Sequence, residues 1–243
     1  DYGFMIRARI TGGVITSQQW LALDQIATQY AKNAIRLTTR QTVQYHRVEK
    51  RDLKASIRAI NDIQLSTIAA CGDVNRNVLS TSNPALSAAH QRTYELAQAI
   101  SDHLIPATGA YNEIWLDGEP LHEKPEHEPI YGKTYLPRKF KIALAVPPDN
   151  DVDVYANDLA FVAIVEVGEL TGYNVLVGGG MGMSHGDTNT YPNAGRVIGL
   201  CKPDQVVAVA EHVVTVQRDY GNRQERKQAR LKYTIDRYGL SWF

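Results

Sequence analysis

The stretch RLTTRQTVQYH, residues 36–46, places two arginines, a histidine and several hydrogen-bond donors where the flanking pattern predicts a sheet. A strand here would carry Thr42, Gln44 and His46 on one face and apolar side chains on the other, because strand side chains alternate. Arginine binds carboxylates through paired, charge-assisted hydrogen bonds. The polar face therefore fits an anionic ligand, and it fits a solvated sheet face as well.

The same stretch also contains a shorter strand and a turn. Arg36 and Thr38 share one face of the strand predicted at 36–38, and Arg40 lies in the turn predicted at 39–41. These side chains and the polar row of the following strand could converge on a single ligand.

Two other segments place cations close together. In LPRKFKIAL, Lys139 and Lys141 flank Phe140, so both ammonium groups emerge on one face of a strand. Like charges at this spacing repel, and a bound anion would stabilise them. Edge-strand lysines that hinder aggregation are the alternative. In DVNRNV, Arg76 follows Asn75 in a turn, where asparagine is common for conformational reasons alone.

Two weaker signals lie toward the C-terminal end. The glycines of LVGGGMG allow the backbone to approach a large flat ligand, or simply allow a tight turn. They lack the spacing of a dinucleotide or P-loop motif. Residues 218–237 hold seven cations against three acids, which indicates either a solvated helix face or a ligand with many carboxylates.

Composition limits the class of protein. The 243 residues carry 26 basic and 26 acidic side chains, so a general binder of nucleic acid or of an anionic membrane is not expected. No apolar run is long enough to span a membrane. Cys71 and Cys201 form neither a disulfide framework nor a metal motif, which favours a reducing compartment. The chain starts within a strand pattern, without a leader, as the interior of a longer chain would.

The elements that must position these residues follow from periodicity. FMIRARI, residues 4–10, predicts a half-buried strand with Arg7 and Arg9 on its open face. A helix is expected from Thr16, where Gln19 completes a capping box. Further helices are predicted at 51–62, 87–104 and 203–217, and further strands at 42–48, 111–117, 139–146, 160–167 and 172–177. The order of elements in the first part predicts half of an α+β sandwich.

These segments, in this order, resemble the sirohaem-containing sulfite and nitrite reductases. The resemblance spans nearly the whole chain and is carried by RLTTRQTVQYH, DVNRNVLSTSNP, YNEIWLDGE, EPIYGKTYLPRKFKIALAVPPDN, ANDLAFVAI, YNVLVGGGMG, VVTVQRDYGNR and RLKYTIDRYG. It implies an α+β fold with mixed or antiparallel sheets flanked by helices. Residues 1–67 would form half of a pseudo-twofold ferredoxin-like domain, and residues 68–243 a central sirohaem-binding domain.

The resemblance also assigns roles to residues. It implies that Arg7, Arg76, Lys139 and Lys141 bind the substrate anion and assist its protonation. Sirohaem carries many peripheral carboxylates, and the implied cofactor-binding residues are Arg36, Thr38, Thr39, Arg40, Gln44, His46, Asn75, Gly178 and Gly179. Thr39 stands where the family more usually has asparagine, which loses the reach of the amide.

The implied activity is the six-electron reduction of sulfite to sulfide in sulfur assimilation and cysteine biosynthesis. Electrons would pass through a [4Fe–4S] cluster, whose family ligands are four cysteines. This chain has two, neither in such a motif. We therefore expect the cluster ligands in a C-terminal half of the same enzyme, an unpaired edge on the first sheet, and little turnover by this chain alone.

Two other functions stay open. A ferredoxin-dependent nitrite reductase would share the fold, the cofactor and the anion site, and a non-catalytic basic-patch module for nucleic acid is the alternative from another class. The expected partners are sulfite and either an NADPH flavoprotein or ferredoxin, with no nucleic acid and no membrane. The expected location is the cytoplasm, or the plastid stroma in a plant or alga.

Overall fold

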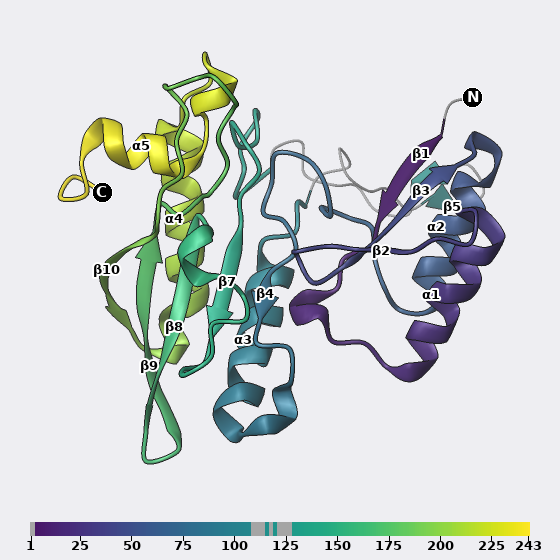
Figure 1. The fold of residues 1–243 in the computed structure, drawn as a ribbon, viewed down its shortest axis with the longest axis horizontal. Helices are drawn as coiled ribbons and strands as arrows, with labels where there is room; N and C mark the ends of the chain where they lie inside the picture. The colour runs from purple at the N-terminus through teal and green to yellow at the C-terminus, as the bar shows by residue number, and fades with distance from the viewer. Residues whose placement is uncertain (1–2, 108–114, 117–118, 121–127) are drawn as a thin grey trace.

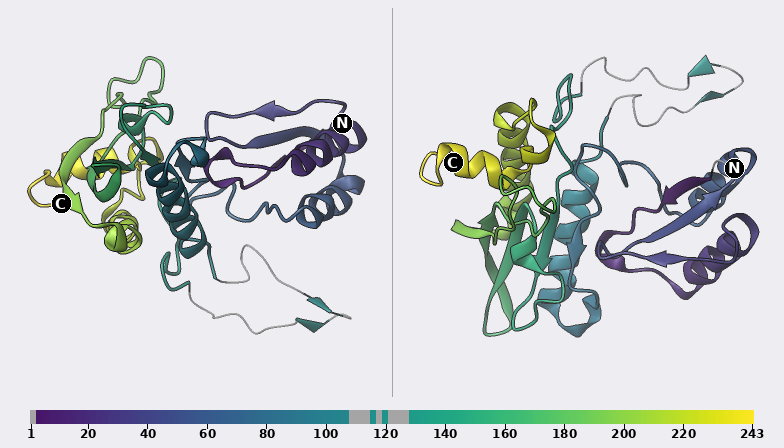
Figure 2. Two further views of the ribbon diagram at one scale, coloured as in Figure 1. Left: turned by 90° about the horizontal axis from the view of Figure 1, so that it is seen from below. Right: turned by 45° about the horizontal axis from the view of Figure 1, so that its top comes forward.

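The computed structural model describes residues 3–107, 115–116, 119–120 and 128–243. Figure 1 shows two units: a small one in purple and blue that holds the first sheet, and a larger one in teal to yellow that holds the second. Figure 2 shows them side by side from two further directions. Each unit has a hydrophobic core of its own.

The small unit is an antiparallel sheet covered on one face by two helices. Its strands run in the order β1-β3-β2, and its elements are β1 (Phe4–Arg7), α1 (Ser17–Tyr30), β2 (Arg36–Leu37), β3 (Val43–Val48) and α2 (Leu53–Asp62). The predicted start of α1 is confirmed, because the Thr16 side chain accepts from the backbone N–H of Gln19 and the Gln19 side chain accepts from that of Thr16. Leu23 and Ile26 of α1 pack with Tyr45 of β3.

The larger unit is a five-stranded mixed sheet with helices on one face. Its strand order is β10-β9-β8-β7-β4, with parallel pairing between β4, β7 and β8 and antiparallel pairing elsewhere. Its elements are β4 (Leu79–Ser80), α3 (Ala88–His103), β7 (Ile142–Ala145), β8 (Leu159–Glu166), β9 (Glu169–Val177), β10 (Arg196–Cys201), α4 (Val206–Tyr220) and α5 (Leu231–Tyr238). A separate pair joins β5 (Trp115–Leu116) to β6 (Glu119–Pro120).

Strand alternation builds the core of this unit. Phe161 of β8 and Tyr173 of β9 are fully buried and contribute to the cluster that α3 and α4 complete. Leu176, one position out of phase, belongs to a smaller cluster on the opposite face. The Tyr173 hydroxyl reaches Thr93 of α3 at 2.8 Å, which satisfies a polar atom at the centre of the core. The predicted α+β class with mixed and antiparallel sheets is confirmed.

Three details differ from the sequence predictions. The strand β10 was not predicted, because its side chains from Val197 to Leu200 are exposed and show no alternation. Arg9 was predicted on an open sheet face, but it is 6% exposed and its Nε donates to Ser101 Oγ of α3 at 3.1 Å. Strand β1 ends at Arg7, so Arg9 instead joins the small unit to the larger one. Of the strand predicted at 111–117, Trp115–Leu116 forms β5, and the rest lies outside the described residues.

Candidate functional site

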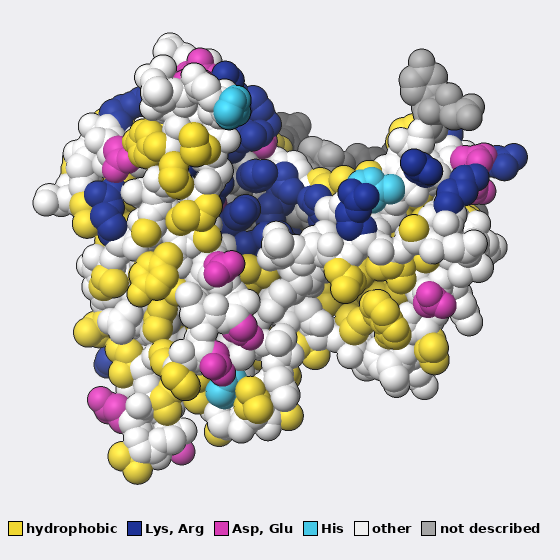
Figure 3. All heavy atoms as spheres, viewed as in Figure 1, with side chains coloured by type: hydrophobic (Ala, Val, Ile, Leu, Met, Phe, Trp, Pro, Cys, Tyr) yellow, Lys and Arg dark blue, Asp and Glu magenta, His cyan; other side chains and the backbone are white. Residues whose placement is uncertain are grey.

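Three of the four predicted anion-binding residues lie on two adjacent segments. The backbone N–H of Arg76 donates to the Phe140 carbonyl at 2.9 Å, and the Phe140 N–H donates to the Val74 carbonyl at 3.0 Å. Phe140 is 1% exposed and packs into the core, so Lys139 and Lys141 on either side of it extend the other way. Arg76 and both lysines are therefore neighbours, as predicted. Figure 3 shows basic side chains gathered in the hollow between the two units.

A buried carboxylate lies among these cations. Asp158, fully buried at the start of β8, accepts from Arg230 Nε at 2.8 Å and from Arg230 Nη2 at 2.9 Å. Its Oδ2 also accepts from the backbone N–H of Lys141 at 2.9 Å. The ion pair orients Arg230 toward the lysines. Its two residues are 72 positions apart in the sequence, so spacing along the chain does not reveal it. The only sequence feature that pointed to Arg230 was the run of cations at residues 218–237.

The pKa values of the two lysines in this cluster are lowered. Burial, followed by the nearby charges of Arg230 and Arg40, lowers the pKa of Lys141 to about 8, against the opposing effect of Asp158. Burial, followed by Arg138 and Arg76, also lowers the pKa of Lys139. Among the described residues, neither ammonium group has a hydrogen-bond or ion-pair partner. Both ammonium groups can therefore bind an anion, and their lowered pKa values make loss of a proton easier than for an ordinary lysine.

The open face of the small sheet carries a row of polar side chains. Arg7 of β1 and Arg36 of β2 both pair in register with Gln44 of β3, so the three lie side by side on one face. Gln44 contacts His46 at 2.9 Å, and Arg7 donates to the Ala70 carbonyl at 3.0 Å. Arg36 is exposed, and the described part of the chain offers it no partner.

Arg7 connects this sheet to the loop that Arg76 of the cation cluster also contacts. Its Nη1 lies 3.1 Å from Cys71 Sγ, and Arg76 Nε donates to the Gly72 carbonyl at 2.8 Å. Both arginines thus hold one short loop, residues 70–72. With the amide of Gln44 turned so that both of its neighbours are satisfied, its oxygen accepts from Arg7 Nε at 2.9 Å and its nitrogen donates to His46 Nε2. His46 then carries its proton on Nδ1.

Arg40 lies in the predicted turn, and its guanidinium is bound within the chain. Its Nη1 donates to Asn157 Oδ1 at 2.6 Å, and its Nη2 donates to the carbonyls of Asn77 and Ile142 at 2.5 and 2.9 Å. Burial lowers the pKa of Arg40 to about 9. The guanidinium therefore ties the turn of the small unit to the larger unit. Asn77, whose Nδ2 also donates to the Ile10 and Arg40 carbonyls, completes this joint.

The remaining predicted residues fall into two groups. Thr38 and Thr39 form the turn, where Thr38 Oγ1 accepts from the Arg40 N–H at 3.2 Å and Thr39 is exposed. Asn75 is fully buried, and neither its amide nitrogen nor its amide oxygen has a partner within the described residues. Such a buried, unsatisfied amide is costly, and it could hydrogen-bond to a polar group of a ligand.

The glycines of the predicted flat-ligand loop are explained by packing within the chain. Gly178 has φ of 81°, in the left-handed region, and its N–H donates to the Asp158 carbonyl at 2.8 Å. A Cβ on Gly179 would lie 2.2 Å from the Tyr155 carbonyl oxygen. Glycine is thus required because the backbone of this loop packs closely against another segment of the same chain, near Tyr155.

Most cations of the segment 218–237 are engaged internally. Arg226 pairs with Asp73 at 2.9 Å, Lys227 with Asp187 at 3.1 Å, and Arg230 with Asp158. Arg218 pairs with its neighbour Asp219, and Arg223 donates to three carbonyls. A many-carboxylate ligand, as considered for this segment, would therefore find few cations of it unpaired. Arg230 lines a pocket of ≈ 200 Å³ with Arg138, Lys139 and the loop at Gly182–Ser184.

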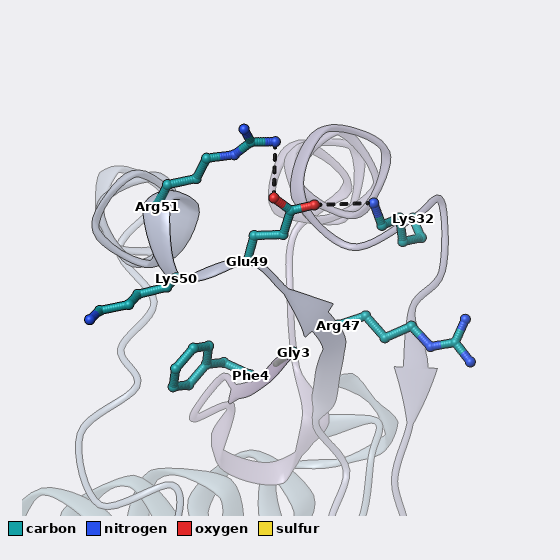
Figure 4. A pocket seen from close by; sticks show the side chains of 7 residues that line it. All are labelled: Gly3, Phe4, Lys32, Arg47, Glu49, Lys50 and Arg51. Carbon is teal, nitrogen blue, oxygen red and sulfur yellow. Dashed lines mark hydrogen bonds and ion pairs between the residues drawn. The ribbon is translucent and has the colours of Figure 1, made fainter. Parts of the chain in front are cut away.

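A larger hollow of ≈ 1090 Å³ lies on the small unit, away from the predicted residues. Figure 4 shows Glu49 between two cations there, with Arg51 at 2.9 Å and Lys32 at 3.4 Å. Exposed ion pairs of this kind contribute little energy. The two lysines predicted to bind an anion lie instead near Asp158.

Within the described ranges, no three histidine, cysteine or acidic side chains come together as metal ligands. Cys71 is exposed and Cys201 is buried, so the chain does not present the four thiolates of a [4Fe–4S] cluster. No helix of the described residues has the length and hydrophobicity to cross a membrane.

Two family models match most of this chain. A model of the nitrite/sulfite reductase ferredoxin-like half domain matches residues 1–63, and one of the nitrite and sulphite reductase 4Fe-4S domain matches residues 95–243. The chain is 61% identical over 241 residues to a sulfite reductase [NADPH] hemoprotein beta-component of Anoxybacillus flavithermus, covering 98% of this chain and 42% of the relative.

Two further matches extend this comparison. The corresponding beta-component of Oceanobacillus iheyensis is 58% identical, over 100% of this chain and 42% of the relative. The solved structure of Mycobacterium tuberculosis NirA protein superposes with a TM-score of 0.75 at 28% identity, over 98% of this chain and 38% of that one. The chain thus spans about 42% of the length of these curated relatives. It belongs to the nitrite and sulphite reductase family.

Proposed function

We propose that this chain forms the sirohaem- and sulfite-binding part of a sulfite reductase that reduces sulfite to sulfide in sulfur assimilation. The observation that carries the proposal is the cluster of Arg76, Lys139 and Lys141 around Asp158, with the side chains of both lysines unpaired among the described residues. The curated relatives at 58–61% identity, named sulfite reductase hemoprotein beta-components, support sulfite over nitrite as the substrate.

The residues present fit a large polycarboxylate cofactor. Arg7, Gln44 and Arg36 lie side by side on one face of the small sheet. Inside the described ranges, exposed Arg36 has no partner, and the buried side-chain amide of Asn75 has none either. We propose that Arg36, Gln44, His46 and Asn75 hold sirohaem, with Thr38 and Thr39 in the same turn. Arg40, Gly178 and Gly179 would shape the site indirectly through the packing described above. When bound, sirohaem would supply the iron at which sulfite is reduced.

The chain's own groups would bind the substrate and supply protons. Arg7 and Arg76 would hold the oxygens of sulfite, since a guanidinium group offers several N–H donors in a planar fork. Lys139 and Lys141 would add positive charge where negative charge develops and would release protons from Nζ as oxygen leaves as water. The lowered pKa of Lys141, about 8, suits such a donor.

The iron–sulfur cluster does not fit this chain by itself. A [4Fe–4S] cluster uses four thiolates, whereas Cys71 is exposed, Cys201 is buried, and no third cysteine exists. We propose that the cluster is ligated by cysteines outside these 243 residues, in a region that corresponds to the remainder of the longer relatives. The electron donor would be a flavoprotein that oxidises NADPH, with ferredoxin as the alternative, and the location the cytoplasm.

The domain boundaries follow the same proposal. Residues 1–67 would be the ferredoxin-like half-domain and residues 68–243 the sirohaem-binding domain. The two hydrophobic cores support this division, because one draws on residues between Ile6 and Ile60 and the other on residues between Ala69 and Ile235.

The test is a visible absorption titration of sirohaem into the natural protein that contains this chain. Wild type is compared with Arg36→Met and with the matched control Arg58→Met, an exposed arginine on α2, which covers the opposite face of the same sheet. We expect Arg36→Met to weaken sirohaem binding at least about 10-fold, since a charge-assisted hydrogen bond is lost. Equal affinities for all three proteins would refute the assignment of this sheet face.

A further inference from the structure

The loop of residues 178–193, hereafter the glycine loop, has almost no core of its own. Within residues 181–190 only Thr190 is buried, and Met181 and Met183 are 50% and 60% exposed. A backbone bridge closes the loop, with Gly180 N–H donating to the Asn193 carbonyl at 2.7 Å and the reverse bond at 2.9 Å. Apolar burial therefore does not explain its shape.

A single buried lysine lies inside this loop. Lys232 of α5 is 1% exposed, and its Nζ donates to the carbonyls of Gly180 at 3.0 Å and Gly182 at 2.9 Å. The Tyr191 carbonyl accepts the remaining hydrogen bond. The rings of Tyr233 and Tyr191 lie 4.9 and 5.6 Å from the ammonium. An ammonium has three N–H donors, and all are used by main-chain carbonyls.

This environment differs from that of the other cations in the segment. Arg226, Lys227 and Arg230 each pair with a carboxylate, whereas no carboxylate contacts Lys232 among the described residues. A charge buried without a counter-ion is expensive unless dipoles replace its water shell. Three carbonyl dipoles and two ring faces do so here, in the manner of a bound monovalent cation.

We propose that Lys232 is an internal cation that positions the glycine loop, rather than a group that binds ligand. Its three donors converge on carbonyls from both arms of the loop, so the ammonium holds the arms together. Because Gly182, Ser184 and Thr190 form one wall of the ≈ 200 Å³ pocket that Lys139 and Arg230 face, the lysine also sets the shape of that pocket. Any role of this pocket in binding substrate or cofactor rests on the proposed function, whereas the role of Lys232 in the loop does not.

The first test is amide hydrogen exchange in the natural protein that contains this chain. Lys232→Met removes the charge at similar length and takes the ammonium donor away from three carbonyls, of which that of Gly180 keeps the N–H of Asn193. We expect the amides of Gly180 and Ser184 to exchange about 10- to 100-fold faster, as for the loss of hydrogen bonds to a charged group, while amides of β8 stay protected. The matched control is Lys227→Met, which removes an exposed lysine that touches the same loop through Asp187. Unchanged loop exchange, or an equal increase throughout the chain, would overturn the proposal.

The second test is rescue. In Lys232→Gly, methylammonium should restore protection of the loop amides, because it can enter the space and donate three hydrogen bonds. Tetramethylammonium has no N–H group and should have no effect. Failure of methylammonium to rescue, or equal rescue by both ions, would show that the loop does not depend on an ammonium at this position.

A third measurement needs no substitution and decides the matter if a variant fails to fold. The ammonium protons of Lys232 in the wild-type protein should exchange with water at least about 10-fold slower than those of Lys227 and show nitrogen–carbonyl couplings across hydrogen bonds. Equal exchange rates for the two lysines would contradict the proposal. Sirohaem plays no part in this readout, so it separates failure of the loop assignment from failure of the proposed function.

Discussion

Asp158 accepts two parallel hydrogen bonds from Arg230, at 2.8 Å from Nε and 2.9 Å from Nη2, at a position where Asp158 is fully buried. This one carboxylate lies among at least four cations, because Arg40, Lys139, Lys141 and Arg230 all sense its charge. Its charge is matched by Arg230 alone, so the lysines leave the site net positive. That surplus is what an anionic substrate and a polycarboxylate cofactor require.

Asp158→Asn should destabilise the fold. The substitution leaves the Arg230 guanidinium without its counter-ion and removes the negative charge of Asp158 near Lys141. Breaking a buried pair typically costs about 3–5 kcal/mol. The free energy of unfolding, measured in urea, should fall by about that amount. Asp187→Asn breaks the exposed pair with Lys227 and serves as the control, with little expected effect. Similar losses in the two variants would contradict the role given to Asp158.

Lys141 should titrate well below an ordinary lysine. Burial and the neighbouring arginines lower its pKa from 10.5 to about 8 in the folded protein. The unfolded chain then binds more protons than the folded one between these values, so this group makes stability rise as pH increases from about 8 to about 10.5. The chemical shift of its ε-carbon should report a midpoint near 8.

An added anion provides the control for that titration. Sulfate bound beside Lys141 favours the charged form and should raise the midpoint. A midpoint above 10, or one that sulfate leaves in place, would show that the lysine is not in the cationic environment described.

Substitution of Arg40 should destabilise the fold, whereas substitution of Arg36, which we propose binds ligand, should not. Arg40→Met removes the guanidinium that donates to the carbonyls of Asn77 and Ile142 at the joint between the units, at a cost of about 3 kcal/mol. Arg36→Met removes an exposed side chain and should leave the free energy of unfolding nearly unchanged. Chemical denaturation of both variants checks this. The prediction is wrong if Arg36→Met is the more destabilising.

Local sequence signals predicted the small unit well. The capping box at Thr16 and Gln19 and the alternation from Val43 to Val48 are readable over a few residues, because each depends on neighbours in the chain. The row of polar side chains on β3 followed from the same alternation. The cations of PRKFK and NRN were recognisable because their types and spacing are unusual for a buried strand.

Contacts distant in the chain were not predictable in the same way. Periodicity places Arg9 on an open face, since it contains no information about α3, which covers it. The Arg230–Asp158 pair joins residues 72 apart, and Lys232 looks like any other cation in a basic run until its loop folds around it. Strand β10 was missed because exposed side chains on both of its faces produce no pattern.

The most direct test of the central claim is sulfite affinity in the sirohaem-loaded natural protein that contains this chain. Wild type is compared with Lys141→Met and with Lys202→Met, an exposed lysine outside the site. The cation cluster predicts that Lys141→Met weakens sulfite binding about 10- to 100-fold, while Lys202→Met binds as wild type does. Nitrite measured in parallel should bind more weakly than sulfite to the wild type. Equal sulfite affinity in all three proteins would contradict the account.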